Sequence, residues 1–113
     1  MEKLNDLSFK GLYYKKVSSK DMGYIKDELS ELKKLAKEHD IFLKSDKINL
    51  GLNGKNTYNV IQVTVTPIKE SLNLFQRIFR PKATIPFYTD KSPYAEAEGE
   101  YLTDIVKKAI SHI

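Results

Sequence analysis

The chain has 113 residues, of which 41% are hydrophobic and 30% charged, and its formal net charge is +4. This length suits a single domain that buries a core without a metal or disulfide, and the composition excludes a disordered chain. The absence of cysteine excludes disulfides, thiolate catalysis and thiolate metal sites.

No apolar run is long enough for a transmembrane helix, and the first six residues lack the apolar stretch of a signal peptide. We therefore expect a cytoplasmic protein with one domain over residues 1–113, in which residues 1–6 fray. Its richness in lysine, asparagine, isoleucine and tyrosine is typical of an AT-rich bacterial or phage genome.

The first predicted strand covers Leu7–Val17, which is rich in aromatic and β-branched residues. Ser18 or Ser19 can cap the helix that follows, because apolar residues then recur at helical spacing. These residues are Met22, Ile25, Leu29, Leu32 and Ala36. We expect this face to pack on the sheet and the helix to end near His39, which would act as a cationic cap.

Two further strands, Ile41–Leu52 and Tyr58–Ile68, flank a turn-rich segment at 53–57. Its Asn-Gly pair would suit a two-residue type I′ turn. A four-residue loop over 54–57 pairs more apolar residues, and a one-residue slip would exchange the faces of the strand. It sets Leu52, Leu50 and Ile48 opposite Asn59, Ile61 and Val63. We predict this register, with a solvated face that carries Gln62, Thr64 and Thr66.

Pro67 ends the third strand, and Pro81 stops a short helix that follows it. Leu72, Phe75, Ile78 and Phe79 fit one face of this helix. A fourth strand follows, because Ala83, Ile85 and Phe87 alternate with the residues between them. Pro86 confines this strand to an edge of the sheet, since proline cannot donate to a ladder.

The last helix is predicted to begin at Ser92-Pro93, a capping serine followed by a proline at the first helical position. Glutamates occupy its early turns and two lysines its last turn, in agreement with the helix dipole. Its apolar face consists of Leu102, Ile105, Val106, Ala109, Ile110 and Ile113.

The element order β-α-β-β-α-β-α predicts an α+β fold, with a mostly antiparallel four-stranded sheet and helices on one face. The first six elements follow the order of the ferredoxin-like split βαβ arrangement, and the last helix is an addition. That arrangement places the fourth strand at an edge, where Pro86 requires it.

The chain has seventeen lysines but two arginines, and both arginines lie within residues 75–81 among aromatic side chains. Arginine is suited to bidentate pairing and stacking, and arginine and aromatic residues are enriched at interface hot spots. We predict that this Arg-aromatic site binds another protein through Phe75, Arg77, Phe79, Arg80 and Lys82. In the alternative interpretation, the arginines are solvated or pair with acidic residues of the last helix.

Other functions have weaker signals. The basic segment Lys69–Lys82 holds four cations and one acid, so it could bind nucleic acid. RNA binding through the sheet face is disfavoured, because the third strand offers one aromatic residue, Tyr58. Glu96, Glu100 and Asp104 would form one column on the last helix and could hold Mg²⁺ or Ca²⁺, although a solvated helix face is the commoner arrangement.

The leading prediction is therefore a small non-enzymatic binding or regulatory protein, of accessory or inhibitor type, that contacts another protein. A nucleic-acid-binding protein is the first alternative, and an enzyme with a carboxylate site is the second. We expect no cofactor.

Overall fold

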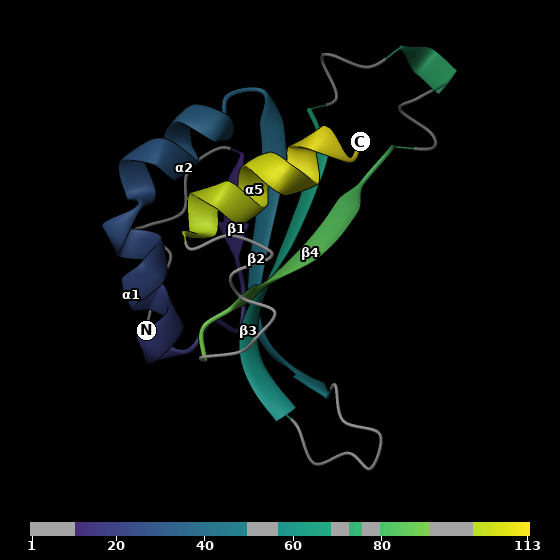
Figure 1. Ribbon diagram of the computed structural model, residues 1–113. Helices are drawn as coiled ribbons and strands as arrows, with labels where there is room; N and C mark the ends of the chain where they lie inside the picture. The colour runs from purple at the N-terminus through teal and green to yellow at the C-terminus, as the bar shows by residue number, and fades with distance from the viewer. Residues whose placement is uncertain (1–10, 50–56, 69–72, 76–79, 91–100) are drawn as a thin grey trace.

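The computed structural model describes residues 11–49, 57–68, 73–75, 80–90 and 101–113. Within these residues lie strand β1 (Leu12–Tyr14), helices α1 (Ser19–Asp27) and α2 (Leu29–Leu35), strands β2 (His39–Asn49), β3 (Thr57–Pro67) and β4 (Ala83–Tyr88), and helix α5 (Leu102–Ser111) (Figure 1). The α+β class is confirmed, and the element order follows the predicted one with the first helix divided in two. Most of the helix predicted between the third and fourth strands lies outside the described residues.

The four strands form one mixed sheet in the order β1-β2-β3-β4. β1 pairs with β2 in parallel, whereas the other two pairings are antiparallel. Parallel neighbours need a crossover connection, and α1 and α2 supply it. The strand order differs from the ferredoxin-like one, in which the first strand is central, because β1 lies here at an edge.

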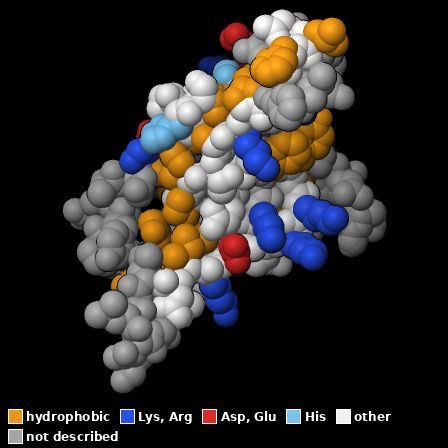
Figure 2. Space-filling view, turned by 90° about the vertical axis from the view of Figure 1, so that its right-hand side faces the viewer, with side chains coloured by type: hydrophobic (Ala, Val, Ile, Leu, Met, Phe, Trp, Pro, Cys, Tyr) orange, Lys and Arg blue, Asp and Glu red, His pale blue; other side chains and the backbone are white. Residues whose placement is uncertain are grey.

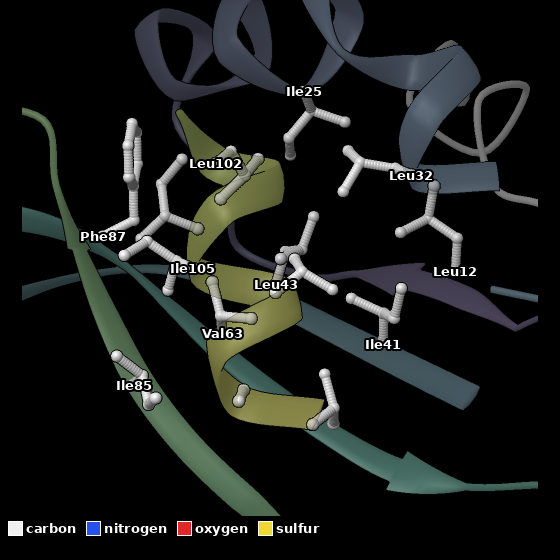
Figure 3. Packing of buried hydrophobic residues seen from close by; sticks show 14 of the residues in the cluster. Leu12, Ile25, Leu32, Ile41, Leu43, Val63, Ile85, Phe87, Leu102 and Ile105 are labelled. Atoms are coloured by element: carbon white, nitrogen blue, oxygen red, sulfur yellow. The ribbon is translucent and has the colours of Figure 1, made fainter. Parts of the chain in front are cut away.

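The core lies between the sheet and the three helices, which cover the same face of the sheet (Figure 1). Side chains alternate along each strand, and one set points toward the helices. Figure 3 shows Ile25, Leu32, Leu102 and Ile105 of the helices directed toward Leu12, Ile41, Leu43, Val63, Ile85 and Phe87 of the strands. Each such buried side chain contributes roughly 1.5–3 kcal/mol. This single cluster joins all the named elements into one domain.

The helix predicted between residues 18 and 39 is interrupted at Glu28, which has φ −115° and ψ 18°. Its start is confirmed, because the Ser18 hydroxyl accepts a hydrogen bond from the Asp21 N–H at 3.1 Å. α2 ends at Leu35. The predicted role of His39 as a helix cap was wrong, because this residue begins β2.

The register of the β2–β3 hairpin also differs from the predicted one. Asn49 lies opposite Thr57 and Ile48 opposite Tyr58, so residues 50–56 separate the last pair. The predicted four-residue loop, with Ile48 opposite Val63, was wrong. The prediction compared apolar residues near the loop, but the buried pairs lie at the far end of the strands. There, Ile41 faces Val65 and Leu43 faces Val63 on the helix-covered side.

The prediction that Pro86 lies on an edge strand is confirmed, because β4 pairs with β3 at the end of the sheet. The Thr89 N–H donates to the Asn59 carbonyl at 3.0 Å. Hydrogen-bonded and non-hydrogen-bonded pairs alternate along antiparallel strands. The N–H of Ile85 therefore points toward β3, whereas the backbone nitrogen of residue 86 points outward. Proline therefore removes no donor from the β3–β4 ladder, and it interrupts the outward row of donors.

Helix α5 begins at Leu102, after Tyr101 in an extended conformation with φ −114° and ψ 150°. The start predicted at Ser92-Pro93 lies outside the described residues. The predicted apolar face is confirmed at Leu102, Ile105, Val106 and Ala109, which are buried. With ten residues, α5 is the longest described helix, and no described helix has the length and apolar character to cross a membrane.

Candidate functional site

The described members of the predicted Arg-aromatic site lie in different environments. Phe75 is 71% exposed, and Lys82 is also exposed. Arg80 is largely covered, and its Nη2 donates to Asp40 Oδ2 at 2.8 Å and to the Pro67 carbonyl at 2.7 Å. These bonds hold Arg80 against one end of the β2–β3 hairpin. Arg77 and Phe79 lie outside the described residues.

Among the described residues, the charged partner of Arg80 is therefore Asp40, at the start of β2. Asp104 instead accepts the Tyr101 N–H at 3.2 Å, as part of the cap of α5. The extended Tyr101 breaks the single helix that the predicted carboxylate column requires, so Asp104 does not continue a column from Glu96 and Glu100, which lie outside the described residues. Within the described ranges, no group of three or more histidine and acidic residues could hold a metal.

The sheet face opposite the helices, here called the open face, brings together side chains that the sequence analysis did not combine. It carries every second residue of the four strands, out of phase with the core. Its members in chain order are Tyr13, Asp40, Phe42, Lys44, Asp46, Ile48, Tyr58, Val60, Gln62, Thr64, Thr66, Thr84, Pro86 and Tyr88. Figure 2 views the molecule from the side of β4 and shows hydrophobic side chains together with several Lys or Arg side chains.

Two large aromatic side chains stack on the open face. Tyr13 lies opposite Phe42 in the parallel β1–β2 register, and their ring centroids are 5.1 Å apart at an interplanar angle of 19°. Each residue is 41% exposed. The same row continues across the sheet through Thr64 and Thr84, whose hydroxyls are 2.9 Å apart. The aromatic pair thus stands at one end of a row that crosses all four strands.

A hollow of about 440 Å³ lies beside this pair, and its described lining consists of Tyr13, Tyr14, Lys15 and Phe42. Lys15 is exposed, and so is Lys44, which lies two residues after Phe42 on the same face. Neither lysine takes part in the ion pairs found among the described residues. The site is therefore an apolar centre with positive charge at its margin.

A second aromatic pair lies at the other end of the open face. The rings of Tyr58 and Tyr88 meet edge to face, with centroids 6.2 Å apart. Val60, opposite Tyr88 on the same face, is completely buried although it does not belong to the core under the helices. This end of the face is consequently better covered than the end that carries Tyr13 and Phe42.

A polar hollow lies near the N-terminus of α1, and three of its lining residues are bonded to one another. The Ser45 hydroxyl donates to Asp21 Oδ2 at 2.6 Å and accepts the Ser18 N–H at 2.8 Å. These bonds tie α1 to β2, so this hollow has a structural role.

Sequence reasoning missed the Tyr13–Phe42 pair because the two strands are neighbours only through the crossover of α1 and α2. The available signal was an aromatic residue directly beside a core residue in each strand, Tyr13 after Leu12 and Phe42 after Ile41. Comparisons of the chain with protein-family models, with curated proteins and with solved structures find no match.

Proposed function

We propose that this protein is a small non-enzymatic binding protein, of accessory or inhibitor type, that contacts another protein through the open face. The observation that carries the proposal is the stacked pair of Tyr13 and Phe42, each 41% exposed. Burial of apolar surface contributes about 25 cal/mol per Å². Aromatic residues are among the commonest interface hot spots, so such a pair suits the centre of a protein contact.

The geometry of the two rings favours a protein over a nucleic acid. Aromatic side chains that bind single strands present open ring faces to the bases. Here the rings cover each other, and a centroid separation of 5.1 Å does not admit a base between them, which needs roughly 7 Å, twice the rise per base along a strand. A complementary apolar surface can cover the exposed parts of both rings.

The Arg-aromatic site is the alternative surface for contact with another protein. Phe75 is exposed enough to meet a partner, whereas Arg80 is bonded to Asp40 and Pro67. An arginine held in this way has little freedom to form a bidentate pair with another molecule. This difference supports the open face over the Arg-aromatic site.

Affinity capture from a native lysate tests the proposal. The full chain, its Phe42→Ala variant and its Phe75→Ala variant are compared as baits, each with and without nuclease. We expect Phe42→Ala to lose the captured protein, Phe75→Ala to retain it, and nuclease to have no effect. Circular dichroism and thermal unfolding of each bait establish that it is folded.

Two outcomes would contradict the proposal. Loss of the captured protein with Phe75→Ala but not with Phe42→Ala would assign the contact to the Arg-aromatic site. Loss on nuclease treatment would assign it to nucleic acid.

A further inference from the structure

Among the described residues, the lysines nearest to the aromatic pair have no acidic ion-pair partner. Lys15 lines the hollow, and Lys44 lies opposite Gln62 in the row next to that of Phe42. Neither row contains an acidic side chain: the row of Phe42 continues through threonines, and the row of Lys44 through Gln62 and Pro86.

Of the two acidic residues of the open face on β2, Asp40 has a charged partner and Asp46 has a local hydrogen bond. Asp40 accepts the guanidinium of Arg80 at 2.8 Å, and Asp46 accepts the backbone N–H of Lys47 at 2.8 Å. Asp46 keeps its charge but lies two rows from Phe42, whereas Lys44 lies one row away and Lys15 lines the hollow. Among the described residues, the uncompensated charges nearest to Tyr13 and Phe42 are therefore positive. Complementary charge on a partner would steer its approach and select it from other proteins.

A second copy of this chain does not fit this charge pattern. In a symmetric dimer the same patch is used by both subunits, so two patches that each carry Lys15 and Lys44 would face each other. Like charges brought together across an interface are unfavourable. The surface fits an acidic partner instead.

We infer that the partner presents an apolar side chain flanked by carboxylates. The apolar side chain occupies the hollow beside Tyr13 and Phe42, and the carboxylates meet Lys15 and Lys44. The hollow is open to solvent, so a large aliphatic or aromatic side chain of the partner can lie in it against Tyr13 and Phe42. This inference rests on the proposed function and adds the chemistry of the partner.

The test is an NMR titration of the ¹⁵N-labelled full chain with a synthetic peptide that has a central Leu-Phe pair and two glutamates on each side. A control peptide carries lysines in place of the glutamates. We expect the acidic peptide to shift the backbone amides of Tyr13–Lys15 and Phe42–Lys44, and to bind at least tenfold more tightly than the control peptide.

Two charge-reversal variants give the matched comparison. Lys44→Glu is expected to weaken binding of the acidic peptide at least tenfold. Lys107→Glu changes the net charge equally at an exposed position of α5, on the helical side of the molecule, and is expected to leave the affinity unchanged. If both variants lost affinity for the acidic peptide to a similar extent, the effect would come from net charge alone, and the inference would be overturned.

Other results would also overturn it: equal binding of the two peptides, shifts confined to another surface, or no shifts at millimolar peptide. A twelve-residue oligothymidylate that shifts the same amides at lower concentration would favour nucleic acid. If these peptide experiments fail while Phe42→Ala still abolishes capture of a protein, the proposed function stands and the acidic chemistry of the partner does not.

Discussion

Glu28 and Thr103, 75 residues apart in the sequence, are joined by two hydrogen bonds to one carboxylate oxygen. Glu28 Oε1 accepts the backbone N–H and the hydroxyl of Thr103, each at 2.8 Å, and Oε2 accepts the Leu102 N–H at 2.9 Å. The first N–H groups of a helix have no intrahelical acceptor, and the dipole favours a negative charge there. The break between α1 and α2 therefore supplies the cap of α5.

We predict that Glu28→Ala lowers the free energy of unfolding by about 2 kcal/mol, because it leaves part-buried donors of α5 without their charged acceptor. Glu31→Ala is the control, since Glu31 is exposed and pairs with Lys34 at 3.3 Å on the helix surface. We expect that variant to lose less than about 0.5 kcal/mol. Urea denaturation measures both values, and equal losses would show that the contact between Glu28 and α5 contributes little.

Alanine at two glycines should have opposite effects. A Cβ at Gly11, where φ is +89°, would lie 2.2 Å from the Ala36 carbonyl oxygen, so Gly11→Ala should cost more than about 2 kcal/mol. Gly23 lies within α1 and has nothing within 4 Å of an added Cβ. Gly23→Ala should stabilise the protein by about 0.5–1 kcal/mol. Thermal and urea unfolding measure the stability of both variants. A Gly11→Ala protein as stable as the wild type would refute the close approach of Gly11 to Ala36.

Truncation of the helix faces should distinguish full from partial burial. Ile105 is completely buried, and we predict that Ile105→Ala costs about 2–5 kcal/mol. Leu29 is only partly buried at the edge of the same cluster, so Leu29→Ala should cost roughly half as much. Denaturant titration compares them. A larger loss at Leu29 would mean that the start of α2 packs more deeply than described.

The pair of Arg80 and Asp40 should behave as an internal brace. Both side chains are mostly covered, at 26% and 19% exposure, so removing one partner leaves the other charge poorly compensated. We predict a coupling energy of about 1–2 kcal/mol in a double-mutant cycle of Arg80→Ala and Asp40→Ala. Arg80→Ala should also leave capture of the protein partner unchanged at a temperature where the variant is folded. If the Arg80→Ala variant had normal stability but no longer captured the partner, Arg80 would belong to the binding site.

The local elements of this protein could be read from its sequence. The alternation of β3 and β4, the apolar face of α5 and the capping Ser18 depend on neighbours a few residues apart, and the structure has them where they were predicted. Pro86 fixed β4 at an edge for an equally local reason, the missing N–H. The start of α5 at Leu102 was not predicted, because the helical pattern did not reveal that Tyr101 is extended.

The sequence by itself determined the α+β class, the alternating faces of β3 and β4 and the apolar face of α5, because these follow from periodicity along the chain. Only the tertiary structure decided that β1 pairs with β2, that Ile48 faces Tyr58, that Glu28 caps α5 and that Arg80 bonds to Asp40. Each of these contacts joins residues far apart in sequence, and its geometry follows from how the whole core packs. The candidate site belongs to this second group, since Tyr13 and Phe42 become one surface only when the crossover of α1 and α2 sets their strands side by side.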